Sequence, residues 1–271
     1  MNMKKIRRTK IGRTNLSSGF SLIEMLLVVA ILTVVLAATF KQIGTAQFRY
    51  NAEGQKLDLT QQAREFIDQF TRDAHQSGYP SPAMYGNRYP LVGLSPNTHP
   101  ANSNLEAAGL WFISQTDVAF EGDLDGLGNV QVIQYHYDDG TSFTGPGTNP
   151  CPCIRRSSLP KIAANPWGQN VPVFYTEIQN LIPGQDIFTA YNANGSPVTL
   201  PTGSLSTSGQ PPTGGILLGN DTSGIDSHSQ ASLQSIKTIR INLTLQAATN
   251  DLATHQSIQV NMTGSARLPN N

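Results

Sequence analysis

The stretch GFSLIEMLLVVAIL, residues 19–32, places a single carboxylate near the start of a long apolar run. The run continues to Phe40, so the 21 residues from Phe20 onward contain Glu24 as their only ionisable side chain. As an α-helix this segment would span roughly 31 Å, which matches the hydrocarbon core of a bilayer. The sequence therefore predicts a transmembrane helix over residues 20–40.

The residues before this helix are strongly basic. Six of the first 19 residues are Lys or Arg, and none is acidic. Basic residues that flank a membrane helix stay on the cytoplasmic side. We therefore expect a single pass with the N-terminus in the cytoplasm and the rest of the chain on the far side. An ordinary cleaved secretory signal fits less well, because its apolar region is usually only about 7 to 15 residues long.

Glu24 is the most informative residue of the apolar run. A carboxylate within a membrane helix costs up to about 3 kcal/mol and marks a functional site by default. The next basic residue along the chain is Lys41, so the helix itself supplies no nearby cation. A cut between Gly19 and Phe20 would create an α-amino group about one helical turn from Glu24. That amine could pair with Glu24 of the same chain or of a neighbour; the alternative is a signal anchor whose glutamate lies in the headgroup region.

Residues 19–24, with the basic leader before them and the apolar run after them, resemble the class III signal of type IV pilins and type II secretion pseudopilins. The resemblance implies that a prepilin peptidase cuts after Gly19 and methylates the amine of Phe20. It also implies that Glu24 pairs with a neighbour's amine during assembly. Ser21 departs from the family's commoner threonine.

Cleavage would remove residues 1–19 as a leader peptide and change the charge balance. The whole chain has 18 basic and 18 acidic residues, so loss of the six basic leader residues leaves 12 against 18, a formal charge of about −6. A mildly acidic exterior gives no reason to expect nucleic-acid binding.

Beyond the apolar run the helical pattern becomes amphipathic, over residues 41–78. Apolar residues recur there at spacings of three and four: Leu59, Ala63, Phe66, Ile67, Phe70 and Ala74. Gly78, followed by Pro80, predicts the end of the helix, because glycine adopts the left-handed cap and proline cannot continue. Gly44 and Gly54 are its weak points, since each costs about 1 kcal/mol relative to alanine.

Residues 79–271 are predicted to form a β-rich globular domain outside the inner membrane. Runs of β-forming residues predict strands at 109–114, 130–137, 153–157, 172–179, 186–191, 235–246 and 257–268. A helix followed by antiparallel strands predicts an α+β fold whose sheets pack on the C-terminal half of the helix. The long loops at 95–104, 140–150 and 202–224 are expected at the surface, with part of the last disordered.

The two cysteines, Cys151 and Cys153, are separated by one proline. In an oxidising compartment this spacing favours a local disulfide that closes a very small ring. Free thiols are the alternative. Metal or redox chemistry is less favoured, because a metal needs further ligands and redox pairs usually have a two-residue spacer.

Asp123 and Asp125 look like half of a calcium loop, which makes calcium the one weak candidate cofactor. Such a loop needs oxygen ligands at alternate positions and an acid at its twelfth position. Leu127 and Gln134 stand where two of these ligands would be, so a plain turn is the favoured interpretation.

The rest of the chain has no nucleophile elbow, phosphate loop or zincin signature, so we expect no enzyme. The five histidines are scattered without metal-ligand spacing, and His136 is expected to have a surface or packing role. Arg155 and Arg156 are expected to form a solvated strand edge rather than an anion site.

A second, more diffuse resemblance covers parts of the β-rich region. Segments 62–79, 120–126, 154–157 and 266–270 are similar to PilW-type minor pilins and to the J-type minor pseudopilin of type II secretion. The leading hypothesis is a minor pilin that helps initiate or cap a type IV pilus, with a minor pseudopilin as the runner-up. The other class is a membrane-anchored ligand-binding module that does not polymerise.

These resemblances also imply partners and a location. The partners would be other pilin or pseudopilin subunits, through the N-terminal helix, together with the prepilin peptidase, the inner-membrane assembly platform and the lipid bilayer. The chain would be stored in a bacterial inner membrane with its C-terminal domain in the periplasm, and would then enter a pilus or pseudopilus.

Overall fold

The computed structural model describes Gly19 and residues 21–80, 107–141, 151–162, 169–218, 232–252 and 254–269. The chain divides into two compact units, residues 1–49 and 50–271. A helix and antiparallel sheets make up the described residues, and the prediction of an α+β fold is confirmed.

Helix α1 (Leu22–Gln76) is continuous through Gly44 and Gly54. The carbonyl of Ser21 accepts hydrogen bonds from the amides of Glu24 and Met25 in the first turn of the helix, at 3.0 Å and 3.1 Å. The helix ends just before Gly78, whose φ of 74° is the left-handed conformation expected of a glycine cap. Both ends therefore lie within two residues of the predicted limits, 20 and 78.

The larger sheet has six antiparallel strands in the order β10-β1-β2-β3-β4-β5. Its members are β1 (Leu110–Ile113), β2 (Val118–Gly122), β3 (Gln131–Asp139), β4 (Pro152–Pro160), β5 (Tyr175–Ile178) and β10 (Ile216–Leu217). Strands β1 to β5 pair with their neighbours in sequence, whereas β10 returns from late in the chain to the edge beside β1.

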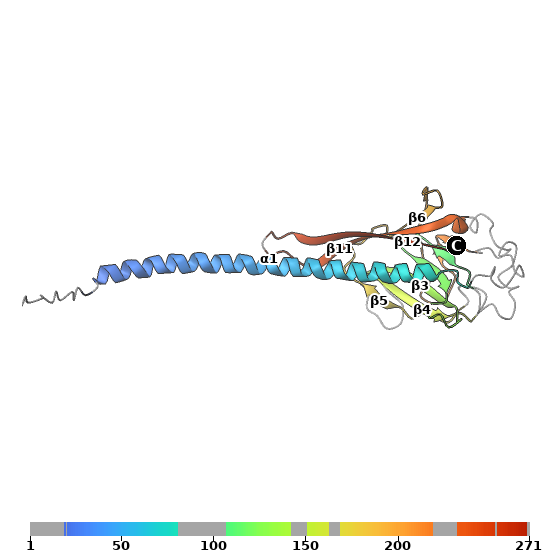
Figure 1. Ribbon diagram of the computed structural model, residues 1–271, viewed down its shortest axis with the longest axis horizontal. Helices are drawn as coiled ribbons and strands as arrows, with labels where there is room; N and C mark the ends of the chain where they lie inside the picture. The colour runs from blue at the N-terminus through green and yellow to red at the C-terminus, as the bar shows by residue number, and fades with distance from the viewer. Residues whose placement is uncertain are drawn as a thin grey trace, which may run out of the picture. The chain divides into compact units, whose positions relative to one another are not determined.

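The second sheet has four antiparallel strands in the order β12-β11-β6-β7. They are β6 (Phe188–Asn192), β7 (Pro197–Val198), β11 (Ile236–Asn250) and β12 (Ser257–Arg267). A small hairpin pairs β8 (Gly203–Ser204) with β9 (Thr213–Gly214). In Figure 1 the C-terminal part of α1 runs between β11–β12 and β3–β5.

The main core forms where α1 meets both sheets. The ring of Phe70 contacts Phe120 of β2, Tyr135 of β3 and Phe188 of β6, with ring centroids 5.1 to 6.1 Å apart. Phe66 packs against Tyr135 from one turn earlier, at 5.8 Å. The apolar face predicted from the helical spacing is therefore the face that joins the two sheets.

Two glycines let strands approach α1 closely. A Cβ on Gly264 of β12 would overlap the side chain of Ile67. A Cβ on Gly122, at the end of β2, would overlap the backbone carbonyl of Gln76. Glycine at these positions lets β12 pack closely on the Ile67 side chain and lets β2 approach the backbone at the end of the helix.

Two sequence-based predictions about the secondary structure of this unit are wrong. Strand β2 was not expected, although its five residues are all buried. The segment 202–224 was expected to be a surface loop; residues 202–218 instead include β8, β9 and β10, and Leu205 and Leu217 are buried. They cover a second apolar cluster around Trp111, on strand β1, so burial of a large aromatic side chain is the physical reason for this order.

The loop predicted at 95–104 and most of the loop predicted at 140–150 lie outside the described residues.

Candidate functional site

The first candidate site is the start of α1. Gly19 is exposed, and a Cβ there would meet no atom within 4 Å. Glu24 lies in the first helical turn, is exposed, and forms no ion pair within the part of the chain that the structure describes. Phe20, the predicted methylated residue, lies outside the described residues. Gly19 is thus accessible, as the residue before a peptidase cut must be.

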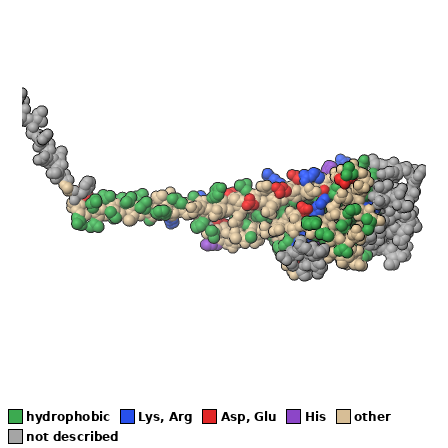
Figure 2. Space-filling model, turned by 90° about the horizontal axis from the view of Figure 1, so that it is seen from below, with side chains coloured by type: hydrophobic (Ala, Val, Ile, Leu, Met, Phe, Trp, Pro, Cys, Tyr) green, Lys and Arg blue, Asp and Glu red, His purple; other side chains and the backbone are tan. Residues whose placement is uncertain are grey.

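The apolar part of α1 is suited to a bilayer in length and composition. Among the described residues, one helix is long and apolar enough to cross a membrane, and none of its most apolar 18-residue window is buried. Leu22, Ile23 and Phe40 expose 78%, 73% and 68% of their surface, and Figure 2 shows apolar side chains gathered along this part of the helix. Contiguous exposure on this scale marks a membrane or partner surface.

The polar groups within this segment are satisfied locally. The hydroxyl of Thr33 donates to the carbonyl of Ala30 at 2.8 Å, and that of Thr39 donates to Val35 at 2.9 Å. Such back-bonding leaves neither donor unsatisfied in lipid, where an unpaired polar group is costly. Glu24 is the exception, because its carboxylate has no partner on its own helix.

Comparison with known proteins adds one observation on this segment. Residues 14–40 match the family model described as the prokaryotic N-terminal methylation motif. The chain carries a prepilin-type signal. Both Gly19 and Glu24 lie within the matched residues. No curated protein and no solved structure matches this chain.

The domain that follows the prepilin-type signal contacts α1 through a partly buried ion pair. Arg156 of β4 donates from Nε to Asp73 of α1 at 2.7 Å, and the hydroxyl of Tyr135 donates to the same oxygen at 2.6 Å. Gln69 binds the other oxygen of Asp73 at 2.8 Å. Burial and the adjacent Asp73 carboxylate raise the pKa of Tyr135, which keeps its hydroxyl a donor. The pair therefore fixes the rotation of α1 on the larger sheet.

The pairing of Arg156 with Asp73 and a second, fully buried pair at Arg155 overturn the prediction that these two arginines form a solvated strand edge. Strand β4 lies inside the sheet, between β3 and β5, and Arg155 is fully buried. Its Nε and Nη2 donate to one oxygen of Asp138, at 3.2 Å and 2.8 Å, and Nη1 donates to Thr176 at 2.9 Å. A guanidinium can be buried here because strands on both sides supply acceptors for it.

Cys151 and Cys153 are joined in the structure as a disulfide, with Cα atoms 5.4 Å apart. The amide of Cys151 donates to Asp138 at 3.1 Å, so the ring lies beside the buried Asp138–Arg155 pair. These two cysteines and Asp138 are the one group of described residues close enough to share a metal ion. In the disulfide form, however, both sulfurs are bonded to each other and Asp138 already binds Arg155.

The loop of Asp123 and Asp125 forms a turn stabilised by its own backbone. The two oxygens of Asp123 accept the amides of Gly126 and Gly128, each at 2.9 Å. Asp125 accepts the amide of Leu127 at 2.9 Å. Three carboxylate oxygens that a calcium ion would need therefore bind backbone amides, which favours the turn over the calcium loop.

A third buried charge site was not identified from the sequence. Asp117, at the turn before β2, lies 2.7 Å from Nδ1 of His136 on β3. Its carboxylate also accepts the amides of Leu205 at 2.7 Å and Tyr137 at 3.0 Å. His136 packs on the ring of Phe174 at 5.6 Å, so it has the predicted packing role together with an ionic partner. Asp117 thus holds the β8–β9 hairpin against the larger sheet.

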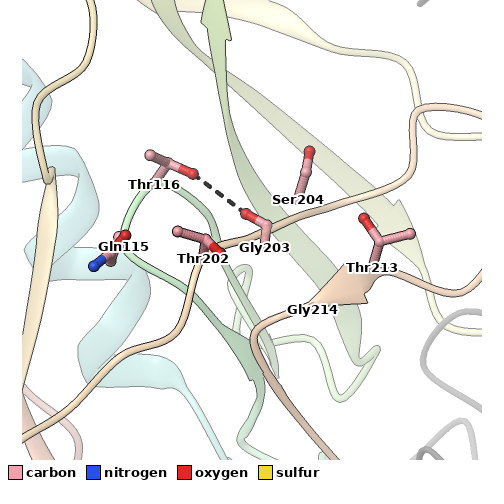
Figure 3. Close-up of a pocket in the computed structure, with 7 residues that line it drawn as sticks. All are labelled: Gln115, Thr116, Thr202, Gly203, Ser204, Thr213 and Gly214. Carbon is pink, nitrogen blue, oxygen red and sulfur yellow. Dashed lines mark hydrogen bonds between the residues drawn. The ribbon is translucent and has the colours of Figure 1, made fainter.

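A shallow cleft lies beside Asp117, between the β1–β2 turn and the β8–β9 hairpin. Its volume is about 500 Å³, and its lining residues are Gln115, Thr116, Thr202, Gly203, Ser204, Thr213 and Gly214. Figure 3 shows Thr116 and Ser204 on either side of Gly203, whose carbonyl accepts the Thr116 hydroxyl at 3.3 Å. The lining groups are hydroxyls, one amide and backbone, none of them charged, so the cleft suits a small neutral polar molecule.

We expect the stability of this domain to depend on pH through the buried ion pair of His136 and Asp117. Burial lowers the pKa of His136, but Asp117, helped by Asp138 and opposed by Arg155, raises it above the ordinary value overall. A raised pKa stabilises the fold fully below the unfolded value of about 6.5, and this stabilisation is lost as the pH rises through the folded value. We expect the urea midpoint of the full chain in detergent to fall between about pH 6 and about pH 9.

The matched variants for this prediction are His136→Gln and His75→Gln. His136→Gln should reduce the fall of the urea midpoint with rising pH. The glutamine amide can still donate to Asp117, but it carries no charge that titrates. His75 is exposed at the end of α1, so His75→Gln should keep the wild-type slope. An equal slope in all three proteins would show that His136 does not titrate with folding.

Proposed function

We propose that this chain is a minor pilin, a subunit that helps to initiate or cap a type IV pilus or a related filament. The observation that carries the proposal is the lone carboxylate of Glu24, in the first turn of an exposed apolar helix and inside the matched methylation motif. A carboxylate without a partner on its own chain needs a cation from elsewhere in lipid. The amine of a neighbouring subunit, freed by cleavage, is such a cation.

The proposal includes processing and location. A prepilin peptidase cuts between Gly19 and Phe20 and methylates Phe20, so residues 1–19 are lost. The basic leader keeps the N-terminus in the cytoplasm, and residues 79–271 fold in the periplasm of a bacterial inner-membrane protein. The oxidising periplasm is also the compartment in which the Cys151–Cys153 disulfide persists.

Two alternatives differ in what happens after processing. A minor pseudopilin of type II secretion would use the same signal and the same helix in a different machine. A membrane-anchored binding module would not polymerise; the uncharged cleft between the β1–β2 turn and β8–β9 is the observation in its favour.

The decisive variant is Glu24→Ala in cells that contain a prepilin peptidase. We expect the membrane-extracted chain to have the intact mass of a protein starting at methylated Phe20, for both wild type and variant. We expect the variant to be depleted at least about tenfold from filaments sheared off the cells, because truncating one partner of a buried charge pair costs about 2 kcal/mol or more.

Glu53→Ala is the matched control, since Glu53 is an exposed acid on the same helix and should enter filaments normally. Normal incorporation of Glu24→Ala would defeat the pairing mechanism. An uncut chain starting at Met1 would indicate a fixed anchor, and the binding-module alternative would then take the lead.

A further inference from the structure

A small basic hollow lies on α1 directly after the apolar run. It is lined by Lys41, Gln42, Thr45, Ala46 and Arg49 and has a volume of about 390 Å³. These residues follow the first at intervals of one, four, five and eight, so they share one face of the helix. The two cationic residues are separated by roughly 12 Å along the axis, with smaller side chains between them.

The positive charge of this hollow is not neutralised by the residues that the structure describes. Residues 41–52 contain Lys41 and Arg49 and no acidic residue. Neither cation forms an ion pair or a side-chain hydrogen bond with another residue that the structure describes. The hydroxyl of Thr45 bonds to the backbone carbonyl of Lys41 at 3.0 Å, which leaves the space between the two cations open.

The position of the hollow relative to the apolar run indicates which kind of ligand it can bind. With residues 20–40 across a bilayer, Lys41 lies at the edge of the hydrocarbon core and Arg49 about two turns beyond it. Helical side chains lean toward the N-terminus, so the Arg49 guanidinium extends back toward the headgroups. Long cationic side chains commonly extend in this way to reach an interface. Lys41, at the edge of the core, extends its ammonium outward to the interface, and Arg49 extends back toward it, so both cations reach the layer of lipid phosphates.

We propose that this hollow binds the phosphate headgroup of an anionic phospholipid in the non-cytoplasmic leaflet of the membrane. The inference rests on the proposed function, because it needs α1 inserted in a bilayer. A phosphate held between Lys41 and Arg49 neutralises charge on the side of the membrane where basic flanking residues are disfavoured. It also fixes the depth of α1 in the bilayer while the subunit is stored.

The experiment measures lipid preference with the full chain in vesicles. Spin-labelled phosphatidylglycerol and spin-labelled phosphatidylcholine are compared for association with the protein by electron paramagnetic resonance. We expect the wild type to prefer phosphatidylglycerol, and Lys41→Gln/Arg49→Gln to reduce that preference about fivefold or more, given the attraction of each basic side chain for an anionic surface. The swap Lys41→Arg/Arg49→Lys retains both positive charges and should retain the preference for phosphatidylglycerol.

The control variant is Arg64→Gln/Arg267→Gln, which removes the same charge from exposed positions in the unit of residues 50–271. It should leave the preference unchanged, and the basic leader contributes equally in every variant. Resistance to alkaline extraction reports insertion separately. Inserted proteins with equal preferences would overturn the lipid site and leave the proposed function standing, whereas failure of the wild type to insert would overturn both.

A final arm distinguishes lipid from free phosphate. Inorganic phosphate is added in excess to the wild-type vesicles, and the preference for phosphatidylglycerol is measured again after correction for ionic strength with chloride. A retained preference supports the lipid headgroup as ligand. Its loss to phosphate, at a matched ionic strength, would show that the hollow is a general phosphate site and would overturn the lipid assignment.

Discussion

Phe70→Ala is expected to lower the free energy of unfolding of the domain by about 3 to 5 kcal/mol, the usual cost of truncating a fully buried phenylalanine. The ring of Phe70 is completely buried and contacts aromatic side chains from both sheets, Phe120 and Tyr135 on one side and Phe188 on the other. Its loss leaves a cavity where α1 and the two sheets meet. Urea denaturation of the full chain in detergent, followed by tryptophan fluorescence, measures the change.

The matched control for Phe70→Ala is Tyr175→Ala. Tyr175 is also aromatic but is 68% exposed on the edge strand β5, so its truncation should change the unfolding free energy by no more than about 0.5 kcal/mol. If Phe70→Ala were as mild as Tyr175→Ala, the helix would not be held by this core, and the packing of α1 on the sheets would have to be described differently.

The long helix can be predicted from the sequence because all its signals are local. An apolar run of bilayer length, apolar residues at spacings of three and four, and Gly78 before Pro80 each act within a few residues. The same holds for strands β3, β11 and β12, whose β-forming runs are long. The prepilin-type signal is also a local pattern, so Gly19 and Glu24 could be singled out before any fold was known.

The parts that could not be predicted depend on contacts between distant segments. Leu205 and Leu217 are ordered because they cover Trp111, which lies about a hundred residues earlier in the chain. The spacing of apolar residues in the segment 202–218 does not predict this contact. Strand β2 is short and contains Glu121, whose buried carboxylate is stabilised by the ammonium of Lys161 at 2.7 Å and the amide of Ala108 at 2.8 Å. From the sequence alone, an acidic residue in a short run predicts a loop, because its buried partner cannot be identified.

The buried charge sites follow the same logic. His136 and Arg155 are cross-strand neighbours in the β3–β4 register, and their partners Asp117 and Asp138 come from a turn and from β3 itself. One signal was available: Asp138 ends one run of β-forming residues and Arg155 lies within another, and the two side chains have opposite charges. Without the register of the two strands, that signal does not distinguish an internal ion pair from a solvated edge.

Arg155→Ala is expected to destabilise the domain by about 3 to 5 kcal/mol, because it leaves the Asp138 carboxylate buried without its cation. Both side chains are almost completely buried, and Thr176 also loses its donor. Arg155→Lys should be milder but still destabilising, since a single ammonium cannot make the contacts of the guanidinium to Asp138 and Thr176 together. Urea denaturation under non-reducing conditions measures both variants with the disulfide intact.

Arg240→Ala is the control for Arg155→Ala, because Arg240 is an exposed arginine in the interior of β11 and its removal should change stability by no more than about 0.5 kcal/mol. An unfolding midpoint for Arg155→Ala equal to that of Arg240→Ala would restore the original interpretation of a solvated arginine. The large loss that we expect would instead establish the ion pair between β3 and β4 as a requirement for folding beside the Cys151–Cys153 ring. It would also separate structural charges in the domain from Glu24, whose substitution should affect assembly and leave this denaturation curve unchanged.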